Sequence, residues 1–476
     1  MTIRKNLSSG ILYTGITKYS GIIVSIIIGA ILARLLSPTE FGVVALITVF
    51  ISFFSILTDF GIGPAVVQNK ELSKEDIQSI FFFSLLFGLI LALLFFFSST
   101  LIASFYNNRE LVPLVRLLSL TVLFSSFRIV PNALLIKDLK FKQIGFVTIA
   151  IQLFSGILAI IFAYKGFSYY ALVYKSIFDG IFTFLLFYWL QPIKLKFKLR
   201  KTSLKKIMRF STFQFLFNFI NYFSRNTDNL LIGKFISPVA LGYYDKSYQL
   251  MMMPVQNLTH VITPVLHPVL SDFQKDKAKI FNTYFKVVKL LATIGFPLSV
   301  FLFFSAQEIV YVLYGSQWEQ SVPVFKILAL TVGVQMALSS TGSIFQAVNR
   351  TDLLFYSGLL SAIFMVCGIC YGIFFGKSLE AVGYGLIGAF VVNFFQGFYM
   401  LIKLALDCSF WKFLKVFNYP LIISLSVGLG LWLLTIFDFD NDYLLLLYKV
   451  IITSIIFLLC NFINGENRKI LLKGLK

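Results

Sequence analysis

The chain has 476 residues, of which 58% are hydrophobic and 13% are charged, and its mean hydropathy is +0.86. Soluble domains carry about 25% charged residues, so this composition excludes an ordinary soluble globular protein. The net charge of +20 raises nucleic acid as a partner. Most of the excess, however, lies in short connections on one side of the apolar segments, and we expect no nucleic-acid partner.

Apolar runs of 20 or more residues recur along the whole chain, and each is long enough to cross about 30 Å of hydrocarbon. Backbone groups in hydrocarbon must be satisfied within the segment, so each run is predicted to be a helix. Residues 1–9 lead directly into the first run, and we expect no cleaved signal peptide. The sequence predicts an all-α membrane protein with about 14 transmembrane helices, at residues 10–36, 41–67, 78–103, 112–136, 142–164, 168–190, 208–235, 240–270, 284–305, 321–348, 354–376, 381–406, 414–437 and 443–464.

The connections between these helices alternate between basic and nearly uncharged. The densest basic segment runs from Lys194 to Arg209. Further basic clusters of the same set lie at 70–74, 137–142, 275–279 and 412–415. The other set is poor in lysine and arginine, and its last member (438–442) is acidic. Short connections rich in Lys and Arg stay in the cytoplasm, so we expect both termini of this multi-pass protein to be cytoplasmic.

A repeat with an offset of 200 residues relates the two halves of the chain. The segment "ARLLSPTEFG" (33–42) aligns without a gap with "GKFISPVALG" (233–242), which pairs Gly42 with Gly242. Further along, "VPLVRLLSLTV" corresponds to "VPVFKILALTV" at an offset of 210. Several matches in the same order indicate an internal duplication rather than chance.

Each half holds six predicted helices, an even number, so both halves enter the membrane in the same orientation. Parallel repeats are related by an axis along the membrane normal, and the substrate path of such transporters lies between the halves. We predict an N-terminal six-helix lobe at 1–200, a C-terminal six-helix lobe at 201–407, and two additional helices with a cytoplasmic tail at 408–476.

Polar residues recur at three- and four-residue steps in the predicted seventh helix, which places them on one helical face. They are Ser211, Gln214, Asn218, Asn221, Arg225 and Asp228. The first helix carries a corresponding stripe, Thr14, Lys18, Gly21, Ser25 and Gly29. Ser, Thr and Gly alone would fit a helix–helix seam, but Lys18, Arg225 and Asp228 exceed what a seam needs. An aqueous cavity lined by the first and seventh helices is the favoured interpretation.

Other polar residues within the predicted helices leave alternatives open. The fourth helix carries a similar face, Thr121, Ser125, Arg128 and Asn132. Asp59 in the second helix is either a counter-ion to a cavity cation or a proton or sodium site. Lys175 and Asp179 lie four residues apart, and they form either a simple ion pair or part of an ion path. His260 and His267 fit gap-filling or a hydrogen-bonded kink better than a proton relay.

Three segments give the sequence a family resemblance: "GAILARLLSPTEFGVVAL" (29–46), "LTDFGIGPAVVQ" (57–68) and "RNTDNLLIGKFISPVALGYYDKSYQL" (225–250). Over about residues 5–405, the chain resembles the bacterial polysaccharide flippases of the multidrug/oligosaccharidyl-lipid/polysaccharide exporter superfamily. Within it, the chain is most similar to the branch that serves O-antigen, colanic-acid and teichuronic-acid export. The resemblance implies two six-helix lobes forming a V around a central cationic cavity, with alternating access.

The resemblance also implies a flippase that moves undecaprenyl-pyrophosphate-linked oligosaccharide from the cytoplasmic to the outer leaflet of a bacterial cytoplasmic (inner) membrane, for synthesis of cell-surface polysaccharide. Arg225, Asp228 and Asp59 stand at positions of the family's pattern, while Lys18 and Arg128 come from helical periodicity. The predicted substrate-binding residues are Lys18, Arg128, Asn218, Asn221 and Arg225. The residues predicted for ion coupling or as counter-ions are Asp59, Asp228 and Asp179.

The expected partners are the lipid-linked oligosaccharide, membrane lipids and the polysaccharide polymerase and chain-length machinery. We expect no cofactor beyond coupling to H⁺ or Na⁺. We also expect no metal site, because the C-x-x-C pair Cys367 and Cys370 lies in an apolar helix without a nearby histidine. A Gly-rich phosphate loop is missing from the sequence, so ATP hydrolysis by this chain is not expected.

Two other functions compete with this one. A cation-coupled multidrug antiporter of the same superfamily would need an acidic, aromatic-lined cavity, and the cations of the first, fourth and seventh helices argue against it. A membrane polysaccharide polymerase or glycosyltransferase would need a sizeable outward connection with catalytic residues, whereas every outward connection is short. We therefore expect a transporter and not an enzyme.

Overall fold

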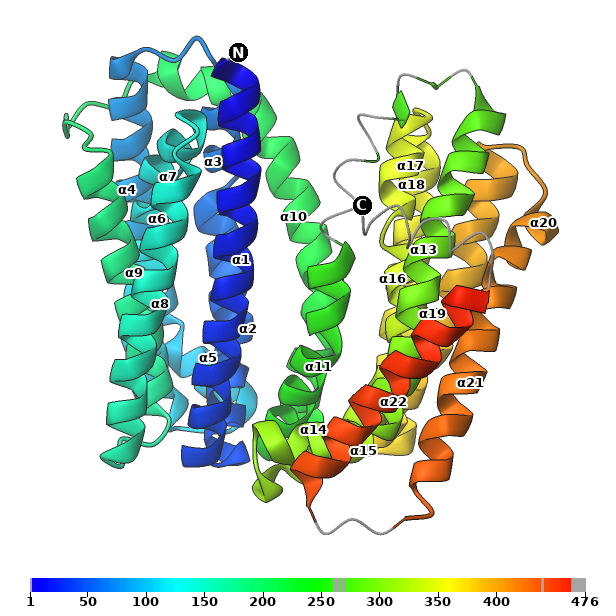
Figure 1. Ribbon diagram of the computed structural model, residues 1–476. Helices are drawn as coiled ribbons and strands as arrows, with labels where there is room; N and C mark the ends of the chain where they lie inside the picture. The colour runs from blue at the N-terminus through cyan, green and yellow to red at the C-terminus, as the bar shows by residue number, and fades with distance from the viewer. Residues whose placement is uncertain are drawn as a thin grey trace. The chain divides into compact units, whose positions relative to one another are not determined.

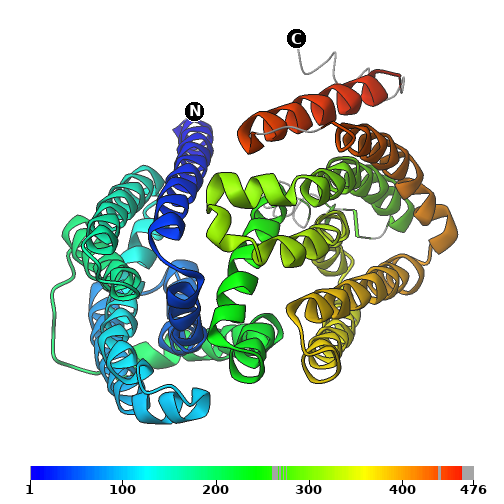
Figure 2. The same ribbon diagram turned by 90° about the horizontal axis from the view of Figure 1, so that it is seen from below.

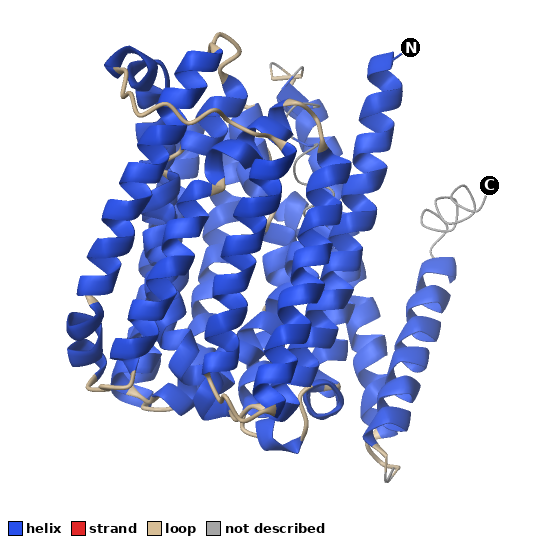
Figure 3. Ribbon diagram, turned by 90° about the vertical axis from the view of Figure 1, so that its left-hand side faces the viewer, coloured by secondary structure: helices blue, strands red, loops and turns tan. Residues whose placement is uncertain are grey.

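The computed structural model describes residues 2–259, 266, 270–271, 273–274, 276–437 and 441–463, except for the side chains of 2–14, 16, 209–210, 213–214, 216–217, 220–221 and 224–225. Throughout this part of the chain the regular elements are helices and no strand occurs (Figure 3). The prediction of an all-α protein is confirmed. Contacts divide the chain into two compact units, residues 1–242 and residues 243–476.

The first unit is built from ten helices among the described residues (Figure 1). They are α1 (Thr2–Leu35), α2 (Pro38–Asp59), α3 (Ile62–Gln68), α4 (Lys74–Phe97), α5 (Ser99–Tyr106), α6 (Leu111–Phe127), α7 (Ile129–Lys137), α8 (Phe141–Tyr164), α9 (Tyr170–Leu190) and α10 (Lys201–Phe235). Serine caps begin two of them: Ser37 forms a capping box with Glu40, and Ser73 forms one with Asp76. Each box satisfies backbone N–H groups that the first helical turn leaves without partners.

Helix α11 (Pro238–Thr259) begins in the first unit and continues into the second. The second unit then holds α13 (Lys277–Phe304), α14 (Ala306–Leu313), η1 (Ser316–Trp318), α15 (Ser321–Ala329), α16 (Val332–Leu338), α17 (Thr341–Ala347), α18 (Thr351–Cys370), η2 (Tyr371–Gly376), α19 (Leu379–Tyr399), η3 (Met400–Ala405), α20 (Phe410–Leu414), η4 (Lys415–Phe417), α21 (Asn418–Leu434) and α22 (Asp442–Ile463) (Figures 1 and 2). Aromatic side chains in tilted and edge-to-face contact help to fill its core, with Phe398, Phe413 and Phe417 buried against one another.

Eleven helical stretches of the described chain are long and apolar enough to cross a membrane, and the bent pair 321–329 and 332–347 makes a twelfth. The predicted seventh and eighth helices correspond to α10 and α11. Their polar residues lower their hydropathy, so neither helix is recognised by composition alone. The predicted number of fourteen is compatible with this count. The predicted lobe boundary at 200 is the start of the second sequence repeat. The limit at 242 separates two compact units by their contacts. The two boundaries are defined differently, so the lobe boundary stays a prediction.

The repeat-related glycines contact each other's helices. A Cβ atom on Gly42 would collide with the carbonyl oxygen of Pro238, and a Cβ atom on Gly242 would collide with the carbonyl oxygen of Pro38. The two helix starts thus approach through their backbones, which only residues without a side chain allow. Ser37 and Ser237 cap these two helix starts in the same way, each accepting a bond from the amide three residues on.

Gly42→Val should therefore destabilise the protein, because the added side chain has no room beside a rigid carbonyl group. Overpacking of this kind costs about 1–3 kcal/mol. Gly388→Val is the matched control, since a Cβ atom there meets nothing within 4 Å. Thermal unfolding in detergent should show a clear loss for the first variant only; equal unfolding temperatures would contradict the close approach.

One end of the first unit is held together by side chains of three basic connections. Lys137 Nζ donates to the carbonyl of Asn69 (2.7 Å), whose own amide reaches the carbonyl of Lys206 (3.4 Å). Lys140 Nζ donates to Gln191 Oε1 at 2.7 Å. The connections after α3, α7 and α9 consequently share one end of this unit. Their grouping agrees with the charge alternation along the sequence.

Asp76 fixes the beginning of α10 to the same end. Its buried carboxylate accepts from Ser203 Oγ (2.6 Å) and from Lys206 Nζ (2.7 Å), both in the first turns of α10. Next to it, Glu75 pairs with Arg200. Buried carboxylates are stable only when paired and hydrogen-bonded, so this cluster joins α10 to α4 in a defined position.

Candidate functional site: a polar cavity in the first unit

Two interrupted helices of the first unit carry charged residues at their breaks. Helix α2 ends at Asp59, because Phe60 (φ 37°) and Gly61 (φ 70°) adopt left-handed backbone conformations before α3 begins. The Gly63 amide hydrogen-bonds the Asp59 carboxylate. Arg128 is the junction residue between α6 and α7 and keeps helical backbone angles (φ −75°, ψ −15°), so the non-helical break is the one after Asp59. Non-helical backbone at membrane depth is tolerated only where it is buried in protein or lines a cavity.

A cavity of about 1030 Å³ lies at these breaks. It is lined by α2, α3, α6, α7, α8 and α9, all of the first unit. Its polar and charged lining residues are Ser55, Thr58, Asp59, Gln68, Ser125, Arg128, Asn132, Thr148, Gln152, Lys175, Asp179 and Thr183. Hydroxyl and amide groups in such number can replace the hydration of a polar solute that enters the cavity.

The charges of the cavity comprise two cations and two carboxylates. Lys175 Nζ lies 3.0 Å from Asp179 Oδ2, and Ser155 Oγ donates to the other oxygen of this carboxylate. Arg128 interacts electrostatically with both Asp179 and Asp59. The two cations differ in one respect: Lys175 is hydrogen-bonded, whereas no described residue forms a hydrogen bond with the Arg128 guanidinium. Arg128 is exposed within the cavity, so its donors remain available for an anion.

The structure brings together three residues that the sequence proposed for separate reasons. Asp59, Arg128 and Asp179 line one cavity. The pairing of Lys175 with Asp179 is confirmed, and both residues line the cavity as well. The Lys175–Asp179 pair is therefore part of the cavity that also contains Arg128, whose guanidinium interacts electrostatically with Asp179.

The residues predicted on the first and seventh helices lie outside the cavity lining or have side chains outside the described part. Lys18 is half-buried on α1 and is not a lining residue, but it lies one turn from Gly21, which faces the lining residue Gln152. On α10, Asn218 is half-buried, and Asp228 is buried with one oxygen accepting the amide of Asn229 (2.8 Å). The remaining predictions there, Asn221 and Arg225, have side chains outside the described part. His260 and His267 lie outside the described residues too.

Sequence reasoning missed the contribution of α8. Thr148, Gln152 and Ser155 face the cavity region from this helix, where the first two line the cavity and the third holds Asp179. Their spacing of four and three residues is the same helical signal that identified Arg128 on the fourth predicted helix. Uncharged polar residues are also common at helix–helix contacts in membranes, so they indicate a cavity less clearly than a charged residue does.

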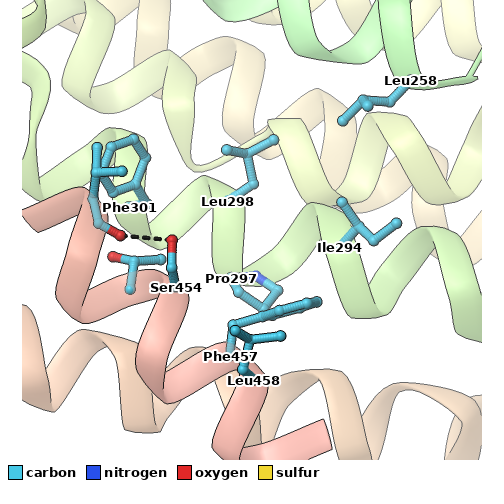
Figure 4. A pocket seen from close by; sticks show the side chains of 10 residues that line it. Leu258, Ile294, Pro297, Leu298, Phe301, Ser454, Phe457 and Leu458 are labelled. Atoms are coloured by element: carbon cyan, nitrogen blue, oxygen red, sulfur yellow. Dashed lines mark hydrogen bonds between the residues drawn. The ribbon is translucent and has the colours of Figure 1, made fainter. Parts of the chain in front are cut away.

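The second unit contains a pocket of the opposite chemistry, about 520 Å³ in volume, between α13 and α22 (Figure 4). Its lining residues are Leu258, Ile294, Pro297, Leu298, Phe301, Val450, Thr453, Ser454, Phe457 and Leu458. The Ser454 hydroxyl donates to the carbonyl of Val450 at 2.8 Å, so it is satisfied within its own helix. The pocket suits a hydrocarbon chain rather than a polar solute.

Comparison with known proteins agrees with this combination of a membrane fold and a polar cavity. The sequence pattern of the family Polysaccharide biosynthesis protein matches residues 31–323. The chain belongs to this family. The matched segment includes α2 to α10 and so covers every helix that lines the polar cavity.

Relatives from two bacteria extend the similarity over most of the chain. The teichuronic acid biosynthesis protein TuaB of Bacillus subtilis (strain 168) is 28% identical over 453 residues, which cover 90% of this chain and 89% of TuaB. The lipopolysaccharide biosynthesis protein WzxC of Escherichia coli (strain K12) is 25% identical over 442 residues, which cover 89% and 87%. The predicted family resemblance is confirmed.

Solved structures show the same fold. The lipid II flippase MurJ in an inward closed conformation superposes with a TM-score of 0.72 at 16% identity, covering 95% of this chain and 98% of MurJ. An inward-facing multidrug resistance transporter of the MATE family reaches 0.64 at 15% identity, covering 81% and 95%. The predicted transporter architecture is thereby confirmed, and the chain is a membrane protein of polysaccharide biosynthesis with a transporter fold.

Proposed function

We propose that this protein flips a polyprenyl-pyrophosphate-linked oligosaccharide, with undecaprenol as the predicted lipid, from the cytoplasmic to the outer leaflet by alternating access. The family, the names of the relatives and the fold shared with a lipid II flippase support a role in transport. The observation that carries the proposal is the Arg128 guanidinium, which is exposed in a cavity of hydroxyl and amide groups and donates no hydrogen bond to any described residue.

Each part of the substrate has a matching surface. Sugar hydroxyls cannot enter hydrocarbon without hydrogen bonds, because each unpaired group costs several kcal/mol, about 2–7. The cavity offers such bonds from Asn132, Gln152 and Thr148, among others. Arginine holds phosphate oxygens through two parallel bonds, and Arg128 is the donor available for this. The lipid tail stays in the bilayer between helices, and the apolar pocket beside α22 has suitable chemistry for part of it.

Asp59 and Asp179 give the empty cavity its balance of charge. When a pyrophosphate engages Arg128, Asp59 loses its cationic neighbour and Asp179 keeps only Lys175, and binding of H⁺ or Na⁺ would compensate. The membrane potential supplies a second driving force, about 2.3 kcal/mol per charge per 100 mV. An interior-negative potential drives a bare pyrophosphate outward. We expect flipping to depend on the potential and to respond to a cation gradient through these carboxylates.

Transport by purified protein in proteoliposomes tests this proposal. Flipping of a labelled lipid-linked oligosaccharide should accelerate when a potassium diffusion potential is imposed. Asp59→Asn should abolish the response to a proton or sodium gradient and keep the response to the potential. The control variant is Glu71→Gln. It removes one carboxylate from the exposed connection after α3 and leaves the cavity unchanged. Flipping that ignores both the potential and the gradients would refute the mechanism.

Complementation of a flippase-null strain tests the remaining assignments. Charge reversals at Lys18 and Arg225 should impair export if the first and seventh predicted helices contribute to the same path. Export that is unchanged in both variants would remove these residues from the site. The drug-antiporter alternative makes the contrary prediction that the protein confers dye resistance on a sensitive host. We propose no catalytic activity, because carrying a preformed substrate needs none.

The orientation forms part of the proposal. The basic connections that share one end of the first unit support a cytoplasmic location of that end, in the inner membrane of a bacterium. The alternation of basic connections along the sequence extends the proposal to both termini. The polysaccharide polymerase and chain-length machinery would receive the flipped substrate on the other side. Protease protection of a tag at each terminus in sealed inverted and right-side-out vesicles would decide the orientation.

A further inference from the structure

The connection between α9 and α10 has a regular chemical pattern. Residues 194–199 read Lys-Leu-Lys-Phe-Lys-Leu and are not helical. Lysine and apolar residues alternate along its sequence. The Lys198 amide donates to the carbonyl of Lys196 at 2.8 Å, so the backbone turns at Phe197. Figure 2 shows the connection passing along the edge of the first unit between the end of α9 and the beginning of α10.

The ends of this segment are anchored and its middle is not. Before it, Ile193 is buried and its carbonyl accepts the hydroxyl of Tyr188 at 3.0 Å. After it, Arg200 pairs with Glu75, and the Arg200 amide donates to Ser79 Oγ at 2.8 Å. The backbone is thus fixed at both ends, and the exposed residues between the two anchors are held in a defined position.

All six residues between these anchors are exposed. Phe197 is 79% exposed and Leu199 is 47% exposed. Lys194, Lys196 and Lys198 form no ion pair or side-chain hydrogen bond with the described residues. This contrasts with Lys206 nearby, which is paired with Asp76. The middle of the connection therefore presents unneutralised charge and unburied apolar surface together.

The contact made by Phe197 shows where residues 194–199 lie along the membrane-crossing helix α4. Its ring packs edge-on against Phe82, with 5.5 Å between ring centroids. Phe82 lies on α4, about two turns from the start of that membrane-crossing helix. Phe197 is consequently at the level where a spanning helix enters the bilayer, and side chains such as Leu and Phe are stable at that boundary.

We propose that residues 194–199 bind the headgroups of anionic phospholipids and that this binding fixes the connection between α9 and α10 at the bilayer surface. The apolar side chains enter the acyl boundary beside α4, and Lys194, Lys196 and Lys198 contact the phosphates. Charge complementarity selects this partner, because the lysines have no acidic counterpart in the described protein. Retention of positive charge in the cytoplasm requires only lysines; it does not require their alternation with exposed leucine and phenylalanine.

The first experiment measures bound lipid. Native mass spectrometry of the full chain, purified with phosphatidylglycerol present, should show several-fold less retained phosphatidylglycerol for the triple variant Lys194→Gln, Lys196→Gln, Lys198→Gln. The matched control is Lys70→Gln, Lys74→Gln, Lys205→Gln, which removes three exposed charges from the same end of the unit and should retain the wild-type amount. Equal losses in both triples, or no loss in either, would overturn the proposal.

The second experiment tests insertion. Phe197→Trp should gain a fluorescence component that brominated phosphatidylglycerol quenches, relative to the wild-type tryptophans, and brominated zwitterionic lipid should quench it less. A component that neither lipid quenches would contradict the proposal. A triple variant that binds phosphatidylglycerol normally but loses affinity for a polyprenyl pyrophosphate would assign the segment to substrate capture and overturn it as well. Neither readout requires transport, so failure here is separate from failure of the proposed flippase.

Discussion

Arg128→Gln should reduce export of lipid-linked oligosaccharide by about tenfold to a hundredfold. The arginine is the cavity cation whose donors no described residue occupies, and it lies at the break between α6 and α7. Hydrogen bonds to charged groups contribute about 1.5–3 kcal/mol each, and 1.4 kcal/mol corresponds to a factor of ten. Removing the guanidinium leaves the phosphates in the cavity without their partner.

Two further variants of Arg128 should export more and less, respectively, than Arg128→Gln. Arg128→Lys keeps the charge but loses the planar pair of donors, so it should retain a measurable fraction of export. Arg128→Glu places a third carboxylate in the cavity and should abolish export. Initial rates in proteoliposomes and surface polysaccharide in a complemented flippase-null strain are the two measurements.

Arg116→Gln is the matched control for this series. Arg116 lies on the same helix α6, stacks over the ring of Phe96 at 5.3 Å, and does not line the cavity. The variant removes the same charge and should export at close to the wild-type rate. Full export by Arg128→Glu, or an equal loss in Arg116→Gln, would show that Arg128 does not bind substrate.

Lys449→Met should strongly destabilise the second unit. Lys449 Nζ lies 2.6 Å from Glu308 Oε1, and the two side chains are only 4% and 8% exposed. The ammonium also donates to the carbonyl of Phe304 at 2.7 Å. Lys449 and Asn461 are the fully buried described residues of α22, and Ile456 and Phe457 pack partly buried against the cluster around Ile423, so the ion pair adds a buried polar attachment to an apolar contact. Removing one partner of a buried pair costs about 3–5 kcal/mol, because the other charge stays buried.

The double variant Glu308→Leu, Lys449→Met should recover much of this loss. An apolar pair of similar volume carries no desolvation cost, and Glu308 Oε2 has no hydrogen-bond partner among the described atoms even in the native pair. Replacing a buried ion pair by apolar residues is often neutral or stabilising. The expected order of stability is therefore double variant near wild type, with both single variants far below.

Heat-induced unfolding in detergent and limited proteolysis of the C-terminal helix measure this order. Lys403→Met provides the control, since Lys403 and Asp407 are 3.8 Å apart and 53% and 76% exposed. Exposed pairs contribute less than about 1 kcal/mol, so this variant should unfold like the wild type. A double variant that loses the sum of both single losses would show that the charges themselves are required.

The helices could be predicted from the sequence because every segment that crosses hydrocarbon must be apolar and must satisfy its own backbone hydrogen bonds. The breaks within the helices were harder to predict. Hydropathy runs through 38–68 as one segment, whereas the chain turns at Phe60, a residue with no intrinsic preference for positive φ. Gly61, in the left-handed region at φ 70°, was the one local signal. The interruption at Arg128 has neither a glycine nor a proline at the break itself.

The cavity followed partly from periodicity. Arg128 and Asn132 were identified by their helical spacing, and Lys175 with Asp179 by a local pairing rule, but their common location required the packing of α6 to α9. The pair Glu308–Lys449 joins residues 141 positions apart. No local pattern relates them, so only the tertiary structure reveals that a buried charge pair attaches α22 in addition to the apolar contacts of Ile456 and Phe457.

The contact between Gly42 and Gly242 has a historical consequence. After a sequence is duplicated, its two copies normally diverge independently, since a change in one copy leaves the other unaffected. Here each copy forms part of the surroundings of the other, because Gly42 faces Pro238 and Gly242 faces Pro38. A larger residue at either position would be removed by selection acting on both copies at once. The gap-free match around these two glycines thus lies where the two copies constrain each other's side chains.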